Sequence, residues 1–336
     1  MLEERYRRQV RFAALGENGQ RQLLESAAVV VGCGALGTVA SEILARAGVG
    51  KLTVIDRDYV ELSNLQRQFL FDEQDAADAL PKAVAAERRL RRINGAIQVV
   101  GVVDDLRPRN AVELLRGADV IVDATDNFET RYLINDYSTL AGVPWIYGAA
   151  VGSYGITMPV LPDLTACFRC LYPEPPSGMQ PTCETAGVLG TVTALIASLQ
   201  ANAAVQILTG NTGVVRRKIT TVDVWHGPLR ELEMPARDPD CPCCGARRFE
   251  WLDGQHDAPV SLCGRNAVQI HASGKVDLAA LTDRLKDEGQ VHSNGFALRF
   301  LREPYEMTVF PDGRAIIKGT TDVGVARSLY ARWIGA

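Results

Sequence analysis

The chain has 336 residues and a net charge of −4, from 40 acidic and 36 basic side chains. A chain of this length forms about two domains with hydrophobic cores. Lysine and arginine are scattered along it, which argues against a nucleic-acid or anionic-membrane binder. The N-terminus lacks the apolar core of a signal peptide, and no unbroken run of about 18 apolar residues predicts a membrane span. We therefore expect a globular, cytoplasmic protein.

Strands and helices alternate in the first part of the chain. A short apolar run begins at residue 27 and leads into glycines and a helical stretch that stops at Gly48. Further strands are predicted at 51–56, 96–103 and 119–127, separated by helical patterns at 81–94 and 109–118. This alternation predicts an α/β fold with a doubly wound, mostly parallel, Rossmann-like sheet.

Three segments follow. Residues 143–160 are apolar and glycine-rich, as buried strands are. Residues 173–187 are rich in proline, glycine and polar side chains without periodicity, which predicts an exposed loop. Residues 188–210 are apolar on every face but interrupted by Thr, Ser, Gln and Asn, so we expect a helix buried in the core or in a dimer interface.

A second domain is predicted after a boundary near residues 251–259. Beyond it come predicted strands at 266–272 and 297–303, helices at 277–288 and 322–334, and a hairpin at 306–319 with a Pro-Asp-Gly turn. We expect one domain at 1–253 and a small α+β domain at 256–336.

The strand–turn–helix at the start of the first domain carries a nucleotide-binding pattern. Gly32, Gly34 and Gly37 form G-x-G-x-x-G, and Asp56 ends the next strand. The glycine turn lets a phosphate approach the helix N-terminus, while the carboxylate suits ribose hydroxyls. The pattern predicts an adenosine-containing ligand but does not choose between NAD and ATP.

Neighbouring polar residues favour a triphosphate. Amide and cationic donors suited to phosphates lie close to the same strand ends, at Asn64, Arg67, Gln68 and Lys82. Asp126 follows another strand, at the edge where parallel strands build the ligand crevice. A carboxylate there suits Mg²⁺ together with phosphate oxygens.

Two C-x-x-C pairs predict a metal site. Cys167 with Cys170 and Cys241 with Cys244 offer four thiolates for a tetrahedral, structural Zn²⁺. Cys243 lies inside the second pair and is an alternative ligand to Cys244.

Taken together and in this order, the motifs resemble the ThiF/MoeB/HesA adenylyltransferases, bacterial relatives of the ubiquitin-activating enzymes. The resemblance covers about residues 1–250 and rests on an ordered set of motifs: RYRRQ, VVGCGALG, IDRDYVELSNLQRQ, Lys82, DATDN, CFRC, TCETAGV and CPCCG. It implies ATP-dependent adenylylation of the C-terminal glycine of a ubiquitin-like sulfur carrier ending in Gly-Gly, with release of pyrophosphate.

The resemblance also implies roles for single residues. Asp56 matches the ribose-binding aspartate, and Arg67 and Lys82 match the phosphate contacts. Asp126 matches the aspartate that positions Mg²⁺. Arg8 matches an arginine that enters the partner subunit's ATP site, which implies a homodimer; Arg5, Arg7 and Arg11 in the same segment are alternatives for this role. The family has a structural zinc at the positions of the two cysteine pairs.

The sequence does not decide the roles of two further cysteines. Cys183 lies in the region of a crossover loop whose cysteine is linked to the carrier in some family members and is dispensable in others. Cys263, in the C-terminal domain, lies near Gly and Arg, as a sulfurtransferase cysteine does, but the segment is too short for a rhodanese domain. We expect this domain to dock the carrier or another partner.

Two other classes of function compete with this interpretation. An NAD-dependent oxidoreductase would explain the glycines and Asp56, but not Arg67, Lys82 and Asp126. A non-catalytic scaffold that binds a ubiquitin-like protein would not need the intact ATP residues. The lack of a catalytic histidine is no objection to adenylylation, because a terminal carboxylate is already ionised at neutral pH. The sequence leaves open which carrier is used, in molybdopterin, thiamine or thionucleoside synthesis.

Overall fold

The computed structural model describes residues 4–176, 185–255, 261–262, 267–270, 274–311 and 313–335. The chain forms two compact units. The first contains residues 1–77 and 81–256, and the second contains residues 78–80 and 257–336. An eight-stranded sheet forms the first unit and a six-stranded sheet the second.

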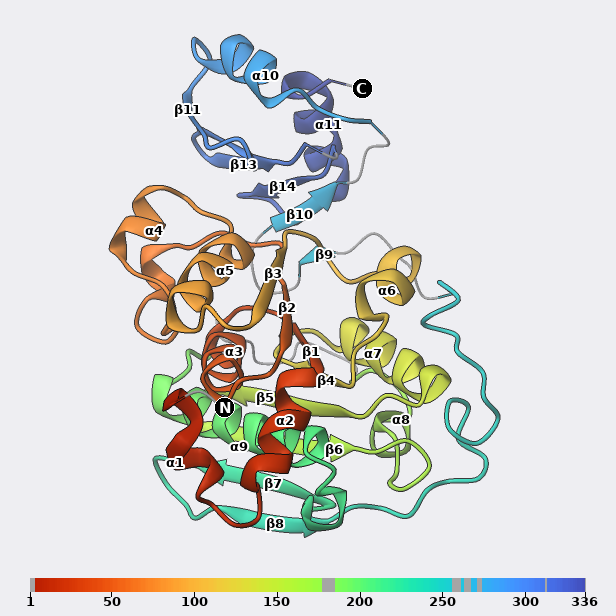
Figure 1. Cartoon of the computed structure of the whole chain (residues 1–336). Coiled ribbons are helices and arrows are strands. Elements are labelled where there is room, and N and C mark those ends of the chain that lie inside the picture. The colour runs from red at the N-terminus through yellow and green to blue at the C-terminus, as the bar shows by residue number, and fades with distance from the viewer. Residues whose placement is uncertain are drawn as a thin grey trace. The chain divides into compact units, whose positions relative to one another are not determined.

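The sheet of the first unit has the strand order β3-β2-β1-β4-β5-β6-β7-β8 (Figure 1). Neighbouring strands are parallel from β3 to β5 and antiparallel from β5 to β8. The strands are β1 (Ala27–Val31), β2 (Lys51–Ile55), β3 (Gln98–Val102), β4 (Val120–Asp123), β5 (Trp145–Val151), β6 (Tyr154–Val160), β7 (Lys218–Asp223) and β8 (Arg230–Glu233). The predicted doubly wound, Rossmann-like sheet is confirmed, and the antiparallel strands β7 and β8 extend it beyond the strands predicted from the sequence.

Helices cover both faces of this sheet (Figure 1). On one face α3 packs against α5 and α9, and on the other α7 packs against α6 and α8. Their bounds are α3 (Ala35–Ala47), α5 (Lys82–Ile93), α6 (Pro108–Leu115), α7 (Phe128–Ala141), α8 (Phe168–Leu171) and α9 (Gly190–Leu208). Smaller elements are η1 (Glu4–Tyr6), α1 (Arg7–Val10), α2 (Gly16–Glu25), η2 (Leu62–Asn64), α4 (Glu73–Ala77) and η3 (Thr212–Val214).

Apolar side chains explain this layering. The central strands β1 and β4 are almost entirely buried, as strands covered on both faces must be. On the face of α7 and α8 the core is aromatic: Phe168 lies 5.7 Å from Trp145 and 5.3 Å from Tyr132, measured between ring centroids. Offset and edge-to-face pairs of this kind add to the stabilisation that burial of the rings provides.

Helix α9 is the one helix, among the residues that the structure describes, with the length and apolar composition of a membrane span. Half of the relevant window is buried in protein. Its Gln200 is fully buried and donates from Nε2 to the carbonyl oxygens of Asp123 (2.6 Å) and Ile146 (3.1 Å). A helix that hydrogen-bonds two strands of the sheet is a core helix, which agrees with the prediction for residues 188–210.

The turn after β1 depends on two glycines. Gly32 has a φ of +91°, a region that side chains disfavour. Gly37 lies on α3 where the helix meets this turn, and a Cβ atom there would come within 1.9 Å of the carbonyl oxygen of Gly32. The first and third glycines of the motif therefore bring α3 close to β1.

The second unit is an antiparallel sheet with helices, in the strand order β11-β12-β13-β14-β10-β9. Its elements are β9 (Ser261–Leu262), β10 (Ala267–Ile270), α10 (Leu278–Leu285), β11 (Gln290–Ser293), β12 (Leu298–Arg302), β13 (Tyr305–Val309), β14 (Ala315–Lys318) and α11 (Val323–Trp333). Phe300, Met307 and Ile317 form its core with Leu281 and Trp333 of the helices. The predicted α+β architecture is confirmed; β9 and β11 were not predicted.

A pair of alanine substitutions tests the packing role of the third glycine. We expect Gly37→Ala to lower the free energy of unfolding by at least about 2 kcal/mol, because the added methyl group meets backbone that cannot move aside. Gly34→Ala is the matched control. A Cβ atom on Gly34 would meet only Gln68 Nε2, at 3.9 Å, so its stability should change by less than about 1 kcal/mol. Urea unfolding measures both; equal stability of the two variants would contradict this account.

Candidate functional site

Asp56 joins the end of β2 to the glycine turn after β1. Its Oδ2 accepts a hydrogen bond of 2.6 Å from the backbone N–H of Cys33, and its Oδ1 accepts one of 2.7 Å from that of Asp58. Burial raises the pKa of Asp56, and the charge of Lys82 opposes this. The carboxylate is thus held at the edge of the sheet where the first three strands end.

The segment Ser63–Gln68 lies beside this turn. The side chain of Asn64 accepts a hydrogen bond of 3.2 Å from the backbone N–H of Glu61, which fixes the start of η2. Arg67 donates from Nη1 to the carbonyl oxygen of Ser63, at 2.9 Å. Both bonds are local, so this segment is shaped largely by its own polar side chains.

Gln68 is a buried amide next to the glycine turn. Its side chain is buried, being 3% exposed, and lies next to Gly34. Its Oε1 has no hydrogen-bond partner among the described residues. The Gln68 amide is therefore a polar group beside the glycine turn with hydrogen-bonding capacity left for a bound molecule.

Lys82 is the first residue of α5 and is only 5% exposed. Its backbone N–H donates to the carbonyl oxygen of Asp58 (2.8 Å), and its Nζ lies 3.4 Å from Asp58 Oδ2. A buried ammonium group in this position could neutralise the negative charge of phosphate oxygens at the same sheet edge.

The loop that carries Asp126 is anchored on both sides. On one side Asp123 accepts two hydrogen bonds from Thr125 through Oδ1, from N at 3.0 Å and from Oγ1 at 2.6 Å. On the other side Asn127 caps α7 by accepting a hydrogen bond from Thr130 N, at 2.8 Å. Asp126 itself is exposed. A Cβ atom on Gly32 would lie 2.6 Å from the carbonyl oxygen of Ala124, so the loop packs directly on the glycine turn.

The structure therefore brings most of the predicted nucleotide residues to one sheet edge. They are Gly32, Gly34, Gly37, Asp56, Asn64, Arg67, Gln68, Lys82 and Asp126. Arg8 lies elsewhere, exposed on α1. Cys183 and Cys263 lie outside the described residues.

Three supporting residues were not predicted. Arg131 on α7 contacts Asp123 through Nε (3.2 Å) and the carbonyl oxygen of Thr125 through Nη2 (2.7 Å). Asp123 is the carboxylate partner of Arg131, and Gln200 donates a hydrogen bond from Nε2 to the carbonyl oxygen of Asp123. The sequence does hold a signal for these three residues: they are charged or amide side chains inside otherwise apolar helices and strands. Such groups are buried only when they are paired.

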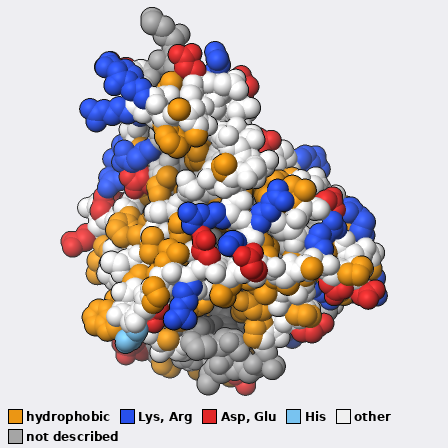
Figure 2. All heavy atoms as spheres, turned by 90° about the horizontal axis from the view of Figure 1, so that it is seen from below, with side chains coloured by type: hydrophobic (Ala, Val, Ile, Leu, Met, Phe, Trp, Pro, Cys, Tyr) orange, Lys and Arg blue, Asp and Glu red, His pale blue; other side chains and the backbone are white. Residues whose placement is uncertain are grey.

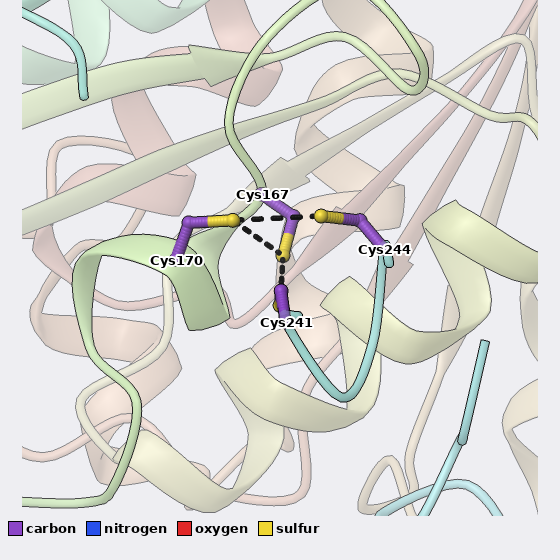
Figure 3. Close-up of side chains that lie close together, drawn as sticks. All are labelled: Cys167, Cys170, Cys241 and Cys244. Atoms are coloured by element: carbon purple, nitrogen blue, oxygen red, sulfur yellow. Dashed lines mark hydrogen bonds between the residues drawn. The ribbon is translucent and has the colours of Figure 1, made fainter. Parts of the chain in front are cut away.

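The four cysteines of the two pairs meet at one point (Figure 3). Cys167 and Cys170 come from the start of α8, and Cys241 and Cys244 from the segment that follows β8. Their sulfur atoms all lie within 4.8 Å of one another. The closest pairs are 3.4 Å (Cys170 and Cys244), 3.7 Å (Cys167 and Cys241) and 3.9 Å (Cys167 and Cys170). Four thiolates about 2.3 Å from a tetrahedral ion would be about 3.8 Å apart, so the cluster could hold a metal ion.

Without a bound cation, at least one thiol of the cluster stays protonated at neutral pH. Burial, with the neighbouring Cys170 thiol, raises the pKa of Cys244 to about 11. Cys243 has a separate role, because Asn135 Nδ2 donates to its Sγ (3.2 Å) and its own thiol contacts Thr139 Oγ1 (3.4 Å). The geometry places Cys244, and not Cys243, in the four-sulfur group.

Comparison with known proteins agrees with this geometry. A model of the ThiF family matches residues 6–243. The sulfur carrier protein ThiS adenylyltransferase of Bacillus subtilis strain 168 is 44% identical over 336 residues, which span 98% of this chain and 99% of that protein. A sulfur carrier protein adenylyltransferase of Thermus thermophilus is 39% identical over 248 residues, 72% of this chain and 90% of that protein. The crystal structure of E. coli MccB with ATP superposes with a TM-score of 0.63 at 25% identity, over 72% of this chain and 75% of that one.

The fold, the site and these relatives define an adenylyltransferase, an enzyme of the nucleotidyltransferase class. The chain belongs to the ThiF family. The resemblance drawn from the ordered motifs is thereby confirmed.

Metal analysis tests the cysteine cluster. We expect the purified protein to carry about one metal ion, and zinc is the ion that four thiolates favour. Cys167→Ser should lose the ion and lower the Tm by at least about 5 °C, because metal binding contributes to folding. Cys243→Ser is the control and should keep the ion. Because the ion displaces thiol protons, its affinity should fall as the pH is lowered. Full metal content in Cys167→Ser would contradict the assignment.

Proposed function

We propose that the protein uses ATP to adenylylate the C-terminal glycine of a ubiquitin-like sulfur carrier, giving an acyl-adenylate and pyrophosphate. The buried amide of Gln68 carries this proposal, because its Nε2 lies next to Gly34 of the glycine turn and its Oε1 has no hydrogen-bond partner among the described residues. Asp56, Lys82 and Asp126 surround the same turn. In support, this sheet arrangement is shared with MccB, whose structure was solved with ATP, and the Bacillus subtilis relative that matches 98% of this chain is named a sulfur carrier protein ThiS adenylyltransferase.

The proposed adenylylation step is a nucleotidyl transfer that forms no covalent bond between the enzyme and the carrier. A carboxylate oxygen of the carrier forms a bond to the α-phosphorus, and the bond from that phosphorus to the bridging oxygen breaks as pyrophosphate leaves. Asp56 would hold the ribose, and Arg67 and Lys82 would neutralise charge on the phosphates. Asp126 would hold Mg²⁺, which screens phosphate charge when bound. The zinc at the cysteine cluster would be structural.

Among the possible carriers we favour one of the ThiS type, which corresponds to the thiamine route. The Bacillus subtilis ThiS adenylyltransferase matches 98% of this chain, including the second unit. The Thermus thermophilus relative matches 72%. A carrier of molybdopterin synthesis is the alternative.

Further parts of the proposal concern assembly. We infer a homodimer in the cytoplasm in which Arg8 reaches the partner subunit's ATP site, since Arg8 is exposed on α1. The small C-terminal domain predicted at 256–336 would dock the carrier or another partner. Cys183 would be the residue to examine for a covalent link to the carrier.

The face of the molecule drawn in Figure 2 carries side chains of mixed type. On the face drawn in Figure 2, acidic and basic side chains alternate with hydrophobic ones, so the described residues of that face form no continuous basic surface. A phosphate backbone requires clustered cations, so this face is a poor fit for nucleic acid.

Two substitutions test the catalytic assignment. Arg67→Ala and Asp126→Ala should each reduce carrier-dependent exchange of labelled pyrophosphate into ATP by at least about 100-fold, because each removes charge stabilisation from the transition state. Arg88→Ala, which changes an exposed arginine of α5, is the control and should keep full activity. Thermal unfolding should be the same in all three variants. Exchange at the wild-type rate in Asp126→Ala would contradict the assignment of Asp126 as the residue that holds Mg²⁺.

A panel of carriers tests the choice of substrate. We expect the highest kcat/KM of pyrophosphate exchange with a ThiS-type carrier, and at least about tenfold less with a molybdopterin-synthase carrier, because contacts with the folded carrier differ. Deleting the last glycine should abolish exchange with either one. The reverse order of the two carriers would assign the enzyme to the molybdopterin route. Absence of exchange with every carrier, together with uptake of a nicotinamide dinucleotide, would favour the oxidoreductase.

A further inference from the structure

Tyr6 is a buried tyrosine in the N-terminal segment, residues 5–11. Its side chain is 1% exposed, although its neighbours along the chain lie at the surface. Its hydroxyl oxygen accepts a hydrogen bond of 2.8 Å from Nδ2 of Asn94, a fully buried amide that also donates to the carbonyl oxygen of Ala45, at 2.7 Å. The ring lies against Gly48, where a Cβ atom would come within 2.6 Å of it. Tyr6 therefore occupies a closely packed site at the C-terminal ends of α3 and α5.

Two further side chains fasten the N-terminal segment to the same helix ends. Gln9 donates from Nε2 to the carbonyl oxygen of Ala47 (2.9 Å) and to Oε1 of Gln20 (2.8 Å). Arg5 donates from Nη1 to the carbonyl oxygen of Ile93, at 2.7 Å. The last carbonyl groups of a helix lack partners within the helix, so these bonds satisfy groups that would otherwise need water. The segment is thus held at residues 5, 6 and 9.

The other face of the segment carries three arginines. Arg7, Arg8 and Arg11 are exposed, and none of their guanidinium groups forms a hydrogen bond or ion pair with a described residue. In helical geometry residues three and four apart share a face, so positions 7, 8 and 11 lie opposite the face of positions 5, 6 and 9. Arg5 is occupied by the helix end, which leaves these three arginines for contact with another molecule.

Arg8 lies far from the nucleotide edge of its own protomer. Helices α3 and α5 begin at that edge, the first after the glycine turn and the second with Lys82. The N-terminal segment contacts the opposite ends of both helices. A helix of 13 residues, such as α3, is about 20 Å long, which is more than an arginine side chain spans. The segment therefore presents its cations to a second copy of the chain rather than to its own site.

We propose that Tyr6 is a positioning residue, whose buried ring and hydroxyl hold the N-terminal segment so that Arg8 enters the ATP site of a partner subunit in one orientation. This inference rests on the proposed function with its homodimer, and adds the element that sets the arginine in place. An arginine on a loose chain end would lose conformational entropy on reaching a phosphate, and anchoring in advance lowers that cost. Asn94 supports this role because its two donor bonds fix the Tyr6 hydroxyl to α3.

Single variants establish whether Tyr6 affects the reaction. Tyr6→Ala should lower the kcat of carrier-dependent pyrophosphate exchange at least about 10-fold, because a misplaced arginine stabilises the transition state poorly. The KM of the carrier should stay within about twofold, and Tyr6→Phe, which keeps the ring, should recover part of the lost kcat. Tyr330→Phe is the matched control: it removes a buried hydroxyl that donates to the carbonyl oxygen of Gly313, at 2.8 Å, and should leave the kcat unchanged. A wild-type kcat in Tyr6→Ala would overturn the positioning role.

Mixed dimers separate positioning from stability. Equal amounts of Arg8→Ala and Asp126→Ala subunits should regain about a quarter of the wild-type exchange, because half of the dimers are mixed and each then has one complete site. Adding Tyr6→Ala to the Asp126→Ala subunit, which supplies the intact arginine, should remove at least about nine-tenths of this regained exchange. Adding it to the Arg8→Ala subunit should have no effect, since that subunit has no arginine to position.

The two placements of Tyr6→Ala decide between the roles. Loss of the regained exchange in both placements would make Tyr6 a residue of general stability, and loss in neither would leave it without effect on Arg8. Either result would overturn the positioning role while the wild type still exchanges pyrophosphate, and so leave the proposed function intact. Mixed dimers that regain nothing would overturn the shared site and this inference with it. A wild type without exchange would overturn the proposed function itself.

Discussion

The buried ion pair between Asp123 and Arg131 is the interaction on which the arrangement of the site depends. Asp123 is fully buried at the end of β4, and Arg131 is 5% exposed on α7. Burial raises the pKa of Asp123, and the charge of Arg131 opposes this. The guanidinium also lies 5.1 Å from the ring centroid of Tyr147. Loss of one partner would leave a buried charge alone, at a cost of about 3–5 kcal/mol. The pair shapes the loop that carries Asp126.

The cysteine cluster is coupled to the same helix. Asn135 on α7 accepts a hydrogen bond of 2.8 Å from Phe168 N, next to Cys167, and donates one of 3.2 Å to Cys243. One turn of α7 thus contacts both cysteine segments, while Asn127, next to Asp126, caps the start of the same helix. A metal bound by the cysteines would stabilise the position of α7, and through it the loop of Asp126, without taking part in the chemistry.

Much of the fold was predictable because local patterns and tertiary packing agree. The run of Ala27–Val31 into glycines matches its place as a strand buried on both faces, and the two C-x-x-C pairs converge as predicted. β7 and β8 were not predicted. β8 is exposed along its length, so it lacks the alternation of buried and exposed residues that marks a half-buried strand.

By itself the sequence determined the alternation of strands and helices, the glycine turn with Asp56, the cysteine pairs and the family, because each depends on spacing along the chain. Only the tertiary structure decided which distant groups meet. It paired Asp123 with Arg131 and Arg57 with Asp105, and placed Cys244 rather than Cys243 beside Cys170. Such pairings depend on which strands lie side by side and on the direction of each side chain, and residue spacing does not encode these.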